Sequence, residues 1–174
     1  MAKIIKNGQI QADDWQILRL AEGDTPESVA IPPGKVALPL AVWQARQGEL
    51  AGRNVGVWLD SHQGAESLAG ALSRLPLVAV NFPKFADGRG YSTAALLRTR
   101  YGYTGELRAI GDVLRDQFFF LTRCGFDALQ PAEGKYSDAQ LEGALASFQD
   151  FSEPYQGAVD QPAPVWRRLS RNAA

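Results

Sequence analysis

A loop rich in basic residues and glycine lies in the middle of the sequence, within residues 82–92. An apolar segment ends at Phe82 and a helical pattern begins near Ser92, so the loop joins a predicted strand to a predicted helix. Glycines let backbone N–H groups turn toward an anion, the amino end of a helix favours negative charge, and arginine adds a planar pair of donors. We therefore predict a site for an oxyanion such as phosphate, sulfate, sulfite or carboxylate. Its residues are Lys84, Asp87, Gly88, Arg89, Gly90 and Ser92.

A plainer interpretation of the same loop is a tight Asp-Gly turn followed by an ordinary helix N-cap, with Arg89 in solvent. The glycine spacing matches neither the P-loop nor the G-x-G-x-x-G pattern, so the sequence does not support nucleotide binding.

Arg108 interrupts the otherwise apolar segment 107–110. A strand of a parallel sheet is covered on both faces, so a buried guanidinium there needs an acidic partner. Asp87, Asp112 and Glu106 are the candidate partners. Alternatively, Arg108 is a second cation of the anion site.

His62, the only histidine in the chain, follows a predicted strand beside Asp60 and Ser61. An imidazole titrates near neutral pH and can act as a general base. We predict His62 and Asp112 as candidate acid–base residues, and the alternative for His62 is an ordinary loop histidine. The sequence places no nucleophile beside His62, so it predicts no catalytic triad.

Four short apolar segments must position these residues, at 55–59, 77–82, 107–110 and 126–129, and segments with helical periodicity separate them. This alternation is typical of βαβ units and a parallel sheet. We predict an α/β fold with about four βα units, as an open doubly wound sheet or, alternatively, a half-barrel-like arc. The polar candidates then gather at the carboxyl ends of the strands, where parallel sheets bind ligands.

Local signals refine these elements. Asn7-Gly8 predicts a type I′ hairpin near the start of the chain. Leu68, Leu72 and Leu75 have the spacing of one helix face. Helix starts are predicted from capping residues at Ser92, Asp112 and Ser137, the last in a capping box with Gln140.

The length of 174 residues favours one globular domain. We divide it into an N-terminal β hairpin and connector (1–35), an α/β domain (36–150) and a C-terminal arm (151–174). A net charge of -1 gives no global field that would attract nucleic acid or an anionic membrane. One cysteine and one histidine exclude an intrachain disulfide and a Cys- or His-rich metal site. Without a long apolar run or a signal-peptide core, we expect a cytoplasmic protein.

Three stretches carry a resemblance to a known family. They are the loop Asn81–Ser92, the segment from Leu97-Arg98 through Tyr101-Gly102-Tyr103 to Gly105–Asp112, and Arg123–Asp127. Over roughly residues 35–150 the chain resembles a bacterial family, domain of unknown function 934. The resemblance implies a role in sulfite reduction, because members are described as oxidoreductases whose genes lie beside those of the sulfite reductase haemoprotein and phosphoadenylylsulfate reductase. It implies no catalytic residues for this chain.

Three functions follow as expectations. The first is an accessory protein of assimilatory sulfite reduction that binds a small oxyanion or the sulfite reductase haemoprotein itself. The second is a sulfur-assimilation oxidoreductase with a loosely bound flavin or another cofactor, although the sequence shows no flavin, nicotinamide, haem or cluster motif. The third is a non-catalytic docking protein that uses Phe119, Phe120 and the arm around Trp166, an arm that would also join copies into a homo-oligomer.

Overall fold

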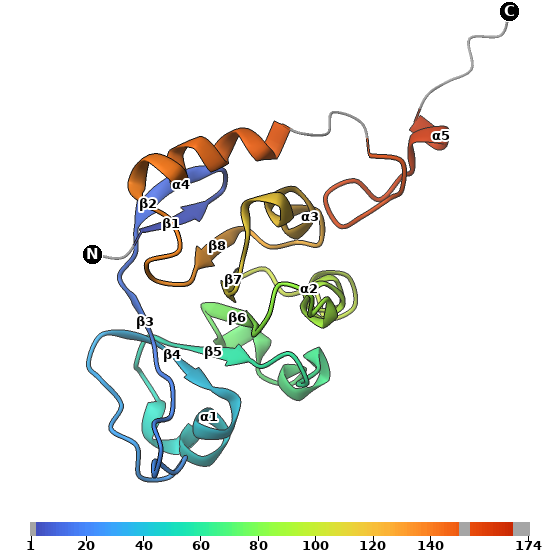
Figure 1. Ribbon diagram of the computed structural model, residues 1–174. Helices are drawn as coiled ribbons and strands as arrows, with labels where there is room; N and C mark the ends of the chain where they lie inside the picture. Colours follow the sequence, from blue (N-terminus) through green and yellow to red (C-terminus); the bar gives the residue numbers. More distant parts are fainter. Residues whose placement is uncertain (1–2, 150–153, 169–174) are drawn as a thin grey trace, which may run out of the picture.

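The computed structural model describes residues 3–149 and 154–168, which form one sheet with helices around it (Figure 1). The strands are β1 (Lys3–Lys6), β2 (Gln9–Ala12), β3 (Trp15–Ile17), β4 (Lys35–Pro39), β5 (Val55–Leu59), β6 (Leu77–Phe82), β7 (Glu106–Gly111) and β8 (Ala128–Pro131). The α-helices are α1 (Leu40–Arg46), α2 (Arg89–Thr99), α3 (Phe118–Arg123), α4 (Asp138–Ala144) and α5 (Val165–Arg168). Short 3₁₀ helices cover Gln47–Leu50, Ala65–Leu68, Leu72–Arg74, Arg115–Gln117 and Leu145–Gln149.

The sheet is mixed, with the strand order β2-β1-β8-β7-β6-β5-β4-β3. From β3 to β8 each strand pairs in parallel with the next. β1 runs antiparallel to both β2 and β8. The predicted parallel sheet is therefore confirmed for β5–β8, which correspond to the four predicted strands; β3 and β4 extend it, and the sheet as a whole is mixed. The cause is the predicted hairpin turn, in which Asn7 and Gly8 have φ values of 51° and 73° and return the chain at once in the opposite direction.

The order of the parallel strands decides between the two predicted architectures. It runs from β3 to β8 without a reversal, so the sheet is a half-barrel and the doubly wound alternative is wrong. Strand and helix alternate along the sequence in the same way in both folds, and only the spatial order of the strands separates them.

The two edges of the sheet lie close together at one end. β2 and β3 are the edge strands, yet only Asp13 and Asp14 connect them. Three virtual bonds span at most about 11 Å between the Cα atoms of Ala12 and Trp15. The sheet must therefore curl, and Figure 1 shows the chain crossing its open side on the way into β3.

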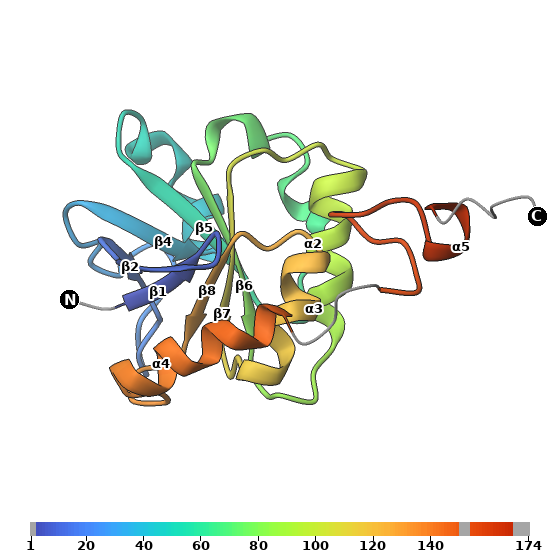
Figure 2. The ribbon, with the colours of Figure 1, turned by 90° about the horizontal axis from the view of Figure 1, so that it is seen from above.

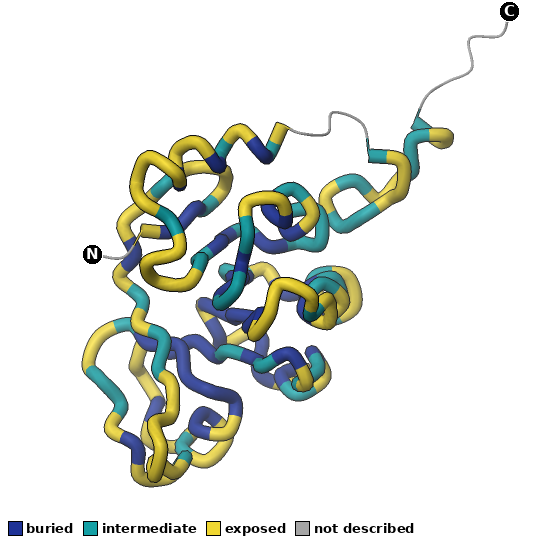
Figure 3. Tube along the Cα trace, viewed as in Figure 1, coloured by how far each residue is buried: buried dark blue, intermediate teal, exposed yellow. Residues whose placement is uncertain are grey.

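The curled sheet has an outer and an inner face, because alternate residues of a strand point to opposite sides. On the outer face, Val78, Val80 and Phe82 of β6 belong to the main core. On the inner face, Leu77 and Ala79 belong to a smaller cluster that also includes residues of β4 and β7. Figure 2 shows α2 and α3 on one side of β6 and β7, and Figure 3 shows that buried residues concentrate along the central strands.

The predicted helix through Leu68, Leu72 and Leu75 is wrong. Two 3₁₀ helices, Ala65–Leu68 and Leu72–Arg74, stand there with Gly70 between them. All three leucines are nevertheless buried. The spacing therefore identified core residues correctly, while a glycine in the middle disfavoured a continuous helix.

One predicted helix cap is confirmed and two are wrong. Ser137 Oγ accepts a hydrogen bond from the Gln140 N–H, and the two residues form the predicted capping box. Ser92 lies inside α2, which begins three residues earlier at Arg89. Asp112 accepts hydrogen bonds from Phe85 and Lys135 instead of capping a helix. Both predictions used local sequence, whereas contacts from other segments determine where these side chains bond.

In the part of the chain that the structure describes, no helix combines the length and apolar character needed to cross a bilayer. The predicted connector and hairpin do not form a separate layer, since β1, β2 and β3 all belong to the sheet that also contains β4–β8. The division into three sequence regions stays a prediction.

Candidate functional site

Polar side chains from the ends of β5 and β6 form one hydrogen-bonded group. Asn81, the second-last residue of β6, donates from Nδ2 to Asp60 Oδ1 over 3.0 Å. The Ser61 N–H donates to the same Asp60 oxygen over 2.8 Å. Ser61 is 8% exposed and Asn81 is 7% exposed, so the contacts of Asp60 fix two nearly buried polar residues at the carboxyl edge of the sheet.

Arg89, the first residue of α2, reaches this group from the neighbouring loop. Its Nη2 donates to Ser61 Oγ over 2.9 Å. The same guanidinium forms a bidentate pair with Asp87, with Nε to Oδ1 at 2.9 Å and Nη2 to Oδ2 at 2.7 Å. The hydrogen bonds from Arg89, and secondarily from Ser61, hold the pKa of Asp87 well below its usual value. Asp87 and Ser61 together therefore fix the direction of the Arg89 fork.

Arg19 approaches the group from the other side and was not among the predicted site residues. Its Nη2 donates to Asn81 Oδ1 over 3.3 Å, and its guanidinium lies 5.2 Å from the ring centroid of Trp58. Trp58 Nε1 in turn donates to the Leu18 carbonyl oxygen over 2.8 Å. β3 has only three residues, and its weak pattern did not identify Arg19 as a strand-end residue. Recognising β3 as another parallel strand would have placed Arg19 at the carboxyl edge.

We call these residues the carboxyl-edge cluster. Its members are Arg19, Asp60, Ser61, Asn81, Asp87 and Arg89. A chain of hydrogen bonds runs through it from one arginine to the other. Within the described residues, Nη1 of Arg19 and Nη1 of Arg89 have no hydrogen-bond partner, and both arginines are exposed. The two carboxylates of the cluster balance the charges of its two arginines, and what each arginine presents to solvent is an Nη1 group that can donate to an oxyanion.

The other loop residues of the predicted site have different environments. Lys84 and Ser92 are exposed. Gly88 has φ -80° and ψ -2°, a helical conformation that any residue adopts. Gly90 is buried, and a Cβ there would lie 2.6 Å from Phe82 Cζ, so this glycine allows α2 to pack on β6. The Arg89 N–H at the start of α2 donates to Asp87 Oδ1 over 3.3 Å, which gives this amide a carboxylate partner within the chain.

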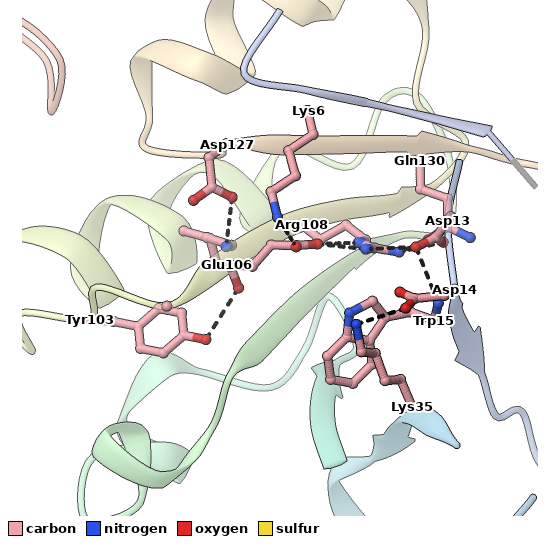
Figure 4. A network of polar contacts seen from close by, with 12 residues as sticks. Lys6, Asp13, Asp14, Trp15, Lys35, Tyr103, Glu106, Arg108, Asp127 and Gln130 are labelled. Atoms are coloured by element: carbon pink, nitrogen blue, oxygen red, sulfur yellow. Dashed lines mark hydrogen bonds and ion pairs between the residues drawn. The ribbon is translucent and has the colours of Figure 1, made fainter. Parts of the chain in front are cut away.

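Arg108 lies on the inner face of the curl, and its hydrogen-bond partners are Asp13, Glu106 and Gln130 (Figure 4). Its side chain is 1% exposed and pairs with Asp13, at 2.7 Å from Nη1, and with Glu106, at 2.6 Å from Nη2. Gln130 Oε1 accepts a further bond of 2.8 Å from Nη1, and Lys6 pairs with Glu106 at 2.7 Å. The guanidinium is therefore directed toward the amino ends of β3 and β7.

Of the three carboxylates that the sequence suggested for Arg108, only Glu106 contacts it within the described residues. Asp87 pairs with Arg89 and Asp112 pairs with Lys135. Asp13 was not predicted, because it lies 95 residues away and reaches Arg108 only through the curl of the sheet.

The sequence model of the family described as "Bacterial protein of unknown function (DUF934)" matches residues 56–166. The chain belongs to the DUF934 family. No curated protein matches it. The DUF934 region begins within β5 and contains Asp60, Ser61, Asn81, Asp87 and Arg89, while Arg19 precedes it.

The two candidate acid–base residues of this DUF934 protein lie in different surroundings. His62 is 66% exposed in its side chain, with Nδ1 3.7 Å from Asp60 Oδ2. Asp112 accepts 2.9 Å bonds from the Phe85 N–H and from Lys135 Nζ. The bond from Lys135, and then the one from Phe85, lowers the pKa of Asp112. His62 thus adjoins the carboxyl-edge cluster, whereas Asp112 joins the loops after β6 and β8.

Two hollows in this DUF934 protein are lined by other residues. One of about 270 Å³ lies at the amino edge of the sheet, among Trp43, Arg53 and Arg74. The other, of about 490 Å³, lies between β8 and the first turn of α4. Among the described residues no group of three or more His, Cys, Asp or Glu side chains is arranged to hold a metal ion.

Proposed function

We propose that this DUF934 protein is an accessory protein of assimilatory sulfite reduction that binds a small oxyanion at the carboxyl-edge cluster. The single observation that supports the anion site is the hydrogen-bonded chain Arg19–Asn81–Asp60–Ser61–Arg89, which fixes two exposed guanidinium groups at one edge of the sheet. The sulfite part of the proposal rests on the family resemblance of the sequence.

Sulfite, sulfate and phosphate share the chemistry that this edge suits, namely several oxygen acceptors around a compact negative charge. Arginine forks bind such groups with two parallel hydrogen bonds, and pre-positioning lowers the entropic cost of binding. Ser61 holds the Arg89 side chain, and Asn81 and the Trp58 ring hold that of Arg19. Asp87 bonds Nε and Nη2 of Arg89, so an anion competes with it for that fork. Lys84, exposed in the same loop as Arg89, would add further positive charge.

A thermal-shift titration of the purified chain with sulfite, sulfate and phosphate tests the anion site. A ligand present at one hundred times its dissociation constant stabilises a protein by about 2.7 kcal/mol. Each kcal/mol shifts the melting temperature of a chain of this size by about 2–4 °C. We expect a clear shift with at least one anion, which disappears in Arg89→Ala and decreases in Arg19→Ala.

The matched control is Arg74→Ala, which removes an exposed arginine at the opposite edge of the sheet. It should respond to anions as the wild type does. Equal shifts in Arg89→Ala, Arg74→Ala and the wild type would mean general salt stabilisation and would overturn the anion site. FMN, FAD and NADPH belong in the same series, because a shift with a flavin would favour the oxidoreductase alternative.

A second experiment tests the role in sulfite reduction separately. Purified sulfite reductase haemoprotein is titrated with the chain in a calorimeter, with and without sulfite. We expect the wild type to bind the reductase. Arg89→Ala should lose this binding if the reductase contacts the carboxyl-edge cluster, and should retain it if the reductase contacts another surface. An absence of binding, together with normal growth on sulfate of a strain that lacks the protein, would contradict the sulfite role while leaving the anion site standing.

A further inference from the structure

The part of the C-terminal arm that the structure describes, residues 154–168, is a loop closed on itself. The Val165 N–H donates to the Tyr155 carbonyl oxygen over 3.2 Å. Arg168 Nη2 donates to the Pro154 carbonyl oxygen over 3.3 Å. Because the two ends of the segment are bonded together, the arm forms a compact unit with its own shape.

Arg123, the last residue of α3, anchors the arm to the rest of the protein. Its Nη2 donates to the Gln156 carbonyl oxygen over 2.6 Å, and its own carbonyl accepts from the Val159 N–H over 3.0 Å. Asp160 lies 3.6 Å from Arg123 Nε. These contacts fix the arm on α3, and Figures 1 and 2 both show α5 pointing away from the sheet.

Large aromatic side chains of the arm are in solvent. Tyr155 is 71% exposed and Trp166 is 60% exposed. The guanidinium of Arg167 lies 4.8 Å from the ring centroid of Trp166. A tryptophan exposed to this extent beside an arginine is a composition typical of the energetic centre of protein interfaces.

The hollow beside α4 has the complementary composition. Its volume is about 490 Å³, and apolar walls are supplied by Pro131, Tyr136 and Leu141. Two acids, Glu133 and Asp138, also line it. Lys3 pairs with Asp138 at 2.6 Å, which leaves the charge of Glu133 in excess. The hollow can therefore receive a flat aromatic group accompanied by a cation.

The 270 Å³ hollow is a poor match for the arm, because it is lined by Arg53 and Arg74 and would repel Arg167. The arm cannot fill the α4 hollow of its own chain while Arg123 holds it. Both ribbon views place α5 and the first turn of α4 at opposite ends of the molecule.

We propose that Trp166 and Arg167 of one copy dock into the hollow beside α4 of a second copy, and that the exchange is reciprocal. Two identical contacts related by a twofold axis close the assembly as a dimer, so no surface is left to propagate a chain. Trp166 packs against the apolar walls, and Arg167 pairs with Glu133 of the partner subunit. This interface is independent of the proposed anion site.

The dimer should be weak and sensitive to salt. The docked tryptophan of each copy buries roughly 150–250 Å² of its own surface, so the two contacts stay below the standard size of about 1,200–2,000 Å² for stable complexes. The ion pair at the rim adds an attraction that salt screens. We therefore expect the full chain to be monomeric when dilute and increasingly dimeric as its concentration rises.

Sedimentation velocity of the full chain over a concentration series tests the proposal through charge reversal. Arg167→Glu places a carboxylate opposite Glu133, and Glu133→Arg places a guanidinium opposite Arg167. Each variant alone should raise the dimer dissociation constant at least tenfold. An equal mixture of the two variants should form heterodimers of near wild-type affinity, because both contacts of that pair are again between opposite charges.

Trp166→Ala should also abolish the dimer, while the control Arg74→Glu makes the same charge reversal on the other hollow and should leave dimerisation unchanged. Circular dichroism confirms that each variant is folded. A wild-type chain that stays monomeric at every concentration would overturn the proposal. So would a dimer that persists in Trp166→Ala, or a mixture of the two charge variants that fails to associate.

Discussion

Arg108 and Asp13 form a bidentate ion pair inside the curled sheet although 95 residues separate them in the sequence. Nη1 lies 2.7 Å from Oδ2, Nη2 lies 3.0 Å from Oδ1, and each side chain is 1% exposed. Asp13 belongs to the short connection between the two edge strands, whereas Arg108 belongs to a central strand. The pair therefore ties the crossing segment to the middle of the sheet.

Removing one partner of this pair should destabilise the fold strongly. Asp13→Ala leaves a buried guanidinium without its bidentate acceptor, a change that lowers the free energy of unfolding by about 3–5 kcal/mol. This is a large part of the roughly 5–15 kcal/mol that stabilises a typical domain. Urea denaturation followed by circular dichroism measures the effect as a lower midpoint.

Asp14 supplies the matched control, since it is the next residue and pairs with Lys35 at a similar 2.7 Å. Its side chain is 61% exposed and that of Lys35 is 42% exposed, so Asp14→Ala should change the urea midpoint little. Arg108→Met alone should be destabilising, because it leaves the buried Asp13 carboxylate without its partner. Combined with Asp13→Leu it should be less so, because neither charge of that pair remains and Glu106 keeps Lys6 as its partner. Simple additivity of the two substitutions would contradict the pairing argument.

Tyr103 should make the fold sensitive to alkaline pH. Its side chain is buried, and its hydroxyl lies 3.0 Å from the Leu75 carbonyl oxygen. Burial raises the pKa of Tyr103 above its ordinary value of 10.0, with a smaller opposing effect from Arg98. A raised folded-state pKa gives stability that is complete below pH 10 and is lost as pH rises toward the folded pKa.

Tyr103→Phe tests this behaviour. At pH 7 it should lower the free energy of unfolding by about 1–3 kcal/mol, because the Leu75 carbonyl loses its donor. Above about pH 10 the difference from the wild type should shrink, since the wild type alone must keep a buried phenol protonated. Tyr155→Phe, at a residue that is 71% exposed, should unfold like the wild type at neutral pH. A difference in the free energy of unfolding between Tyr103→Phe and the wild type that grows at high pH would contradict a raised pKa of Tyr103.

The fold was predictable from sequence wherever the signal was local. Asn7-Gly8 identified the hairpin, and Ser137 with Gln140 identified the start of α4. The mixed sheet and its curl were not predictable in this way, because they depend on β1 pairing with β8 and on a two-residue crossing between edges.

The candidate site shows the same division. Asp60, Ser61, Asn81 and Arg89 follow from the rule that ligands bind at the carboxyl ends of parallel strands. Arg19 does not, because it follows β3, a strand of only three residues whose parallel partner β4 begins much later in the sequence, at Lys35. The partner of Arg108 could not be found either, since Asp13 reaches it only once the sheet has curled.

Gly111 should be required at the carboxyl edge, for two reasons that can be separated. It has φ +98°, and a Cβ there would lie 2.5 Å from the Phe82 carbonyl oxygen and 2.8 Å from Asn81 Oδ1. Gly111→Ala should therefore combine left-handed strain of about 1–2 kcal/mol with overpacking of about 1–3 kcal/mol. Chemical denaturation gives the total, and the thermal shift with anions should decrease because Asn81 is displaced.

Gly134→Ala is the control that introduces the left-handed backbone strain without the overpacking. Gly134 has φ +74°, with nothing within 4 Å of a Cβ at that position. This variant should lose only about 1–2 kcal/mol and should bind anions as the wild type does. Equal losses in the two variants would show that β6 gives way to the new Cβ, and would remove the packing role assigned to Gly111.

Asp87 should stabilise the fold down to unusually low pH. Arg89, and secondarily Ser61, hold the pKa of Asp87 well below its ordinary value of 3.8. A lowered folded-state pKa gives stability that is present above pH 3.8 and is lost as pH falls through the folded pKa. Melting temperatures of the wild type and Asp87→Asn should therefore differ by a constant amount from pH 7 to about 5 and converge below about pH 4.

The same substitution connects stability with binding, because Asp87 competes with a bound anion for the Arg89 fork. At neutral pH Asp87→Asn removes that competing charge, so sulfite, sulfate or phosphate should bind more tightly even though the free protein melts at a lower temperature. Asp116→Asn, at an exposed aspartate in the 3₁₀ helix before α3, should change neither quantity. Weaker anion binding in Asp87→Asn would contradict the competition. It would mean that Asp87 is needed to aim the guanidinium.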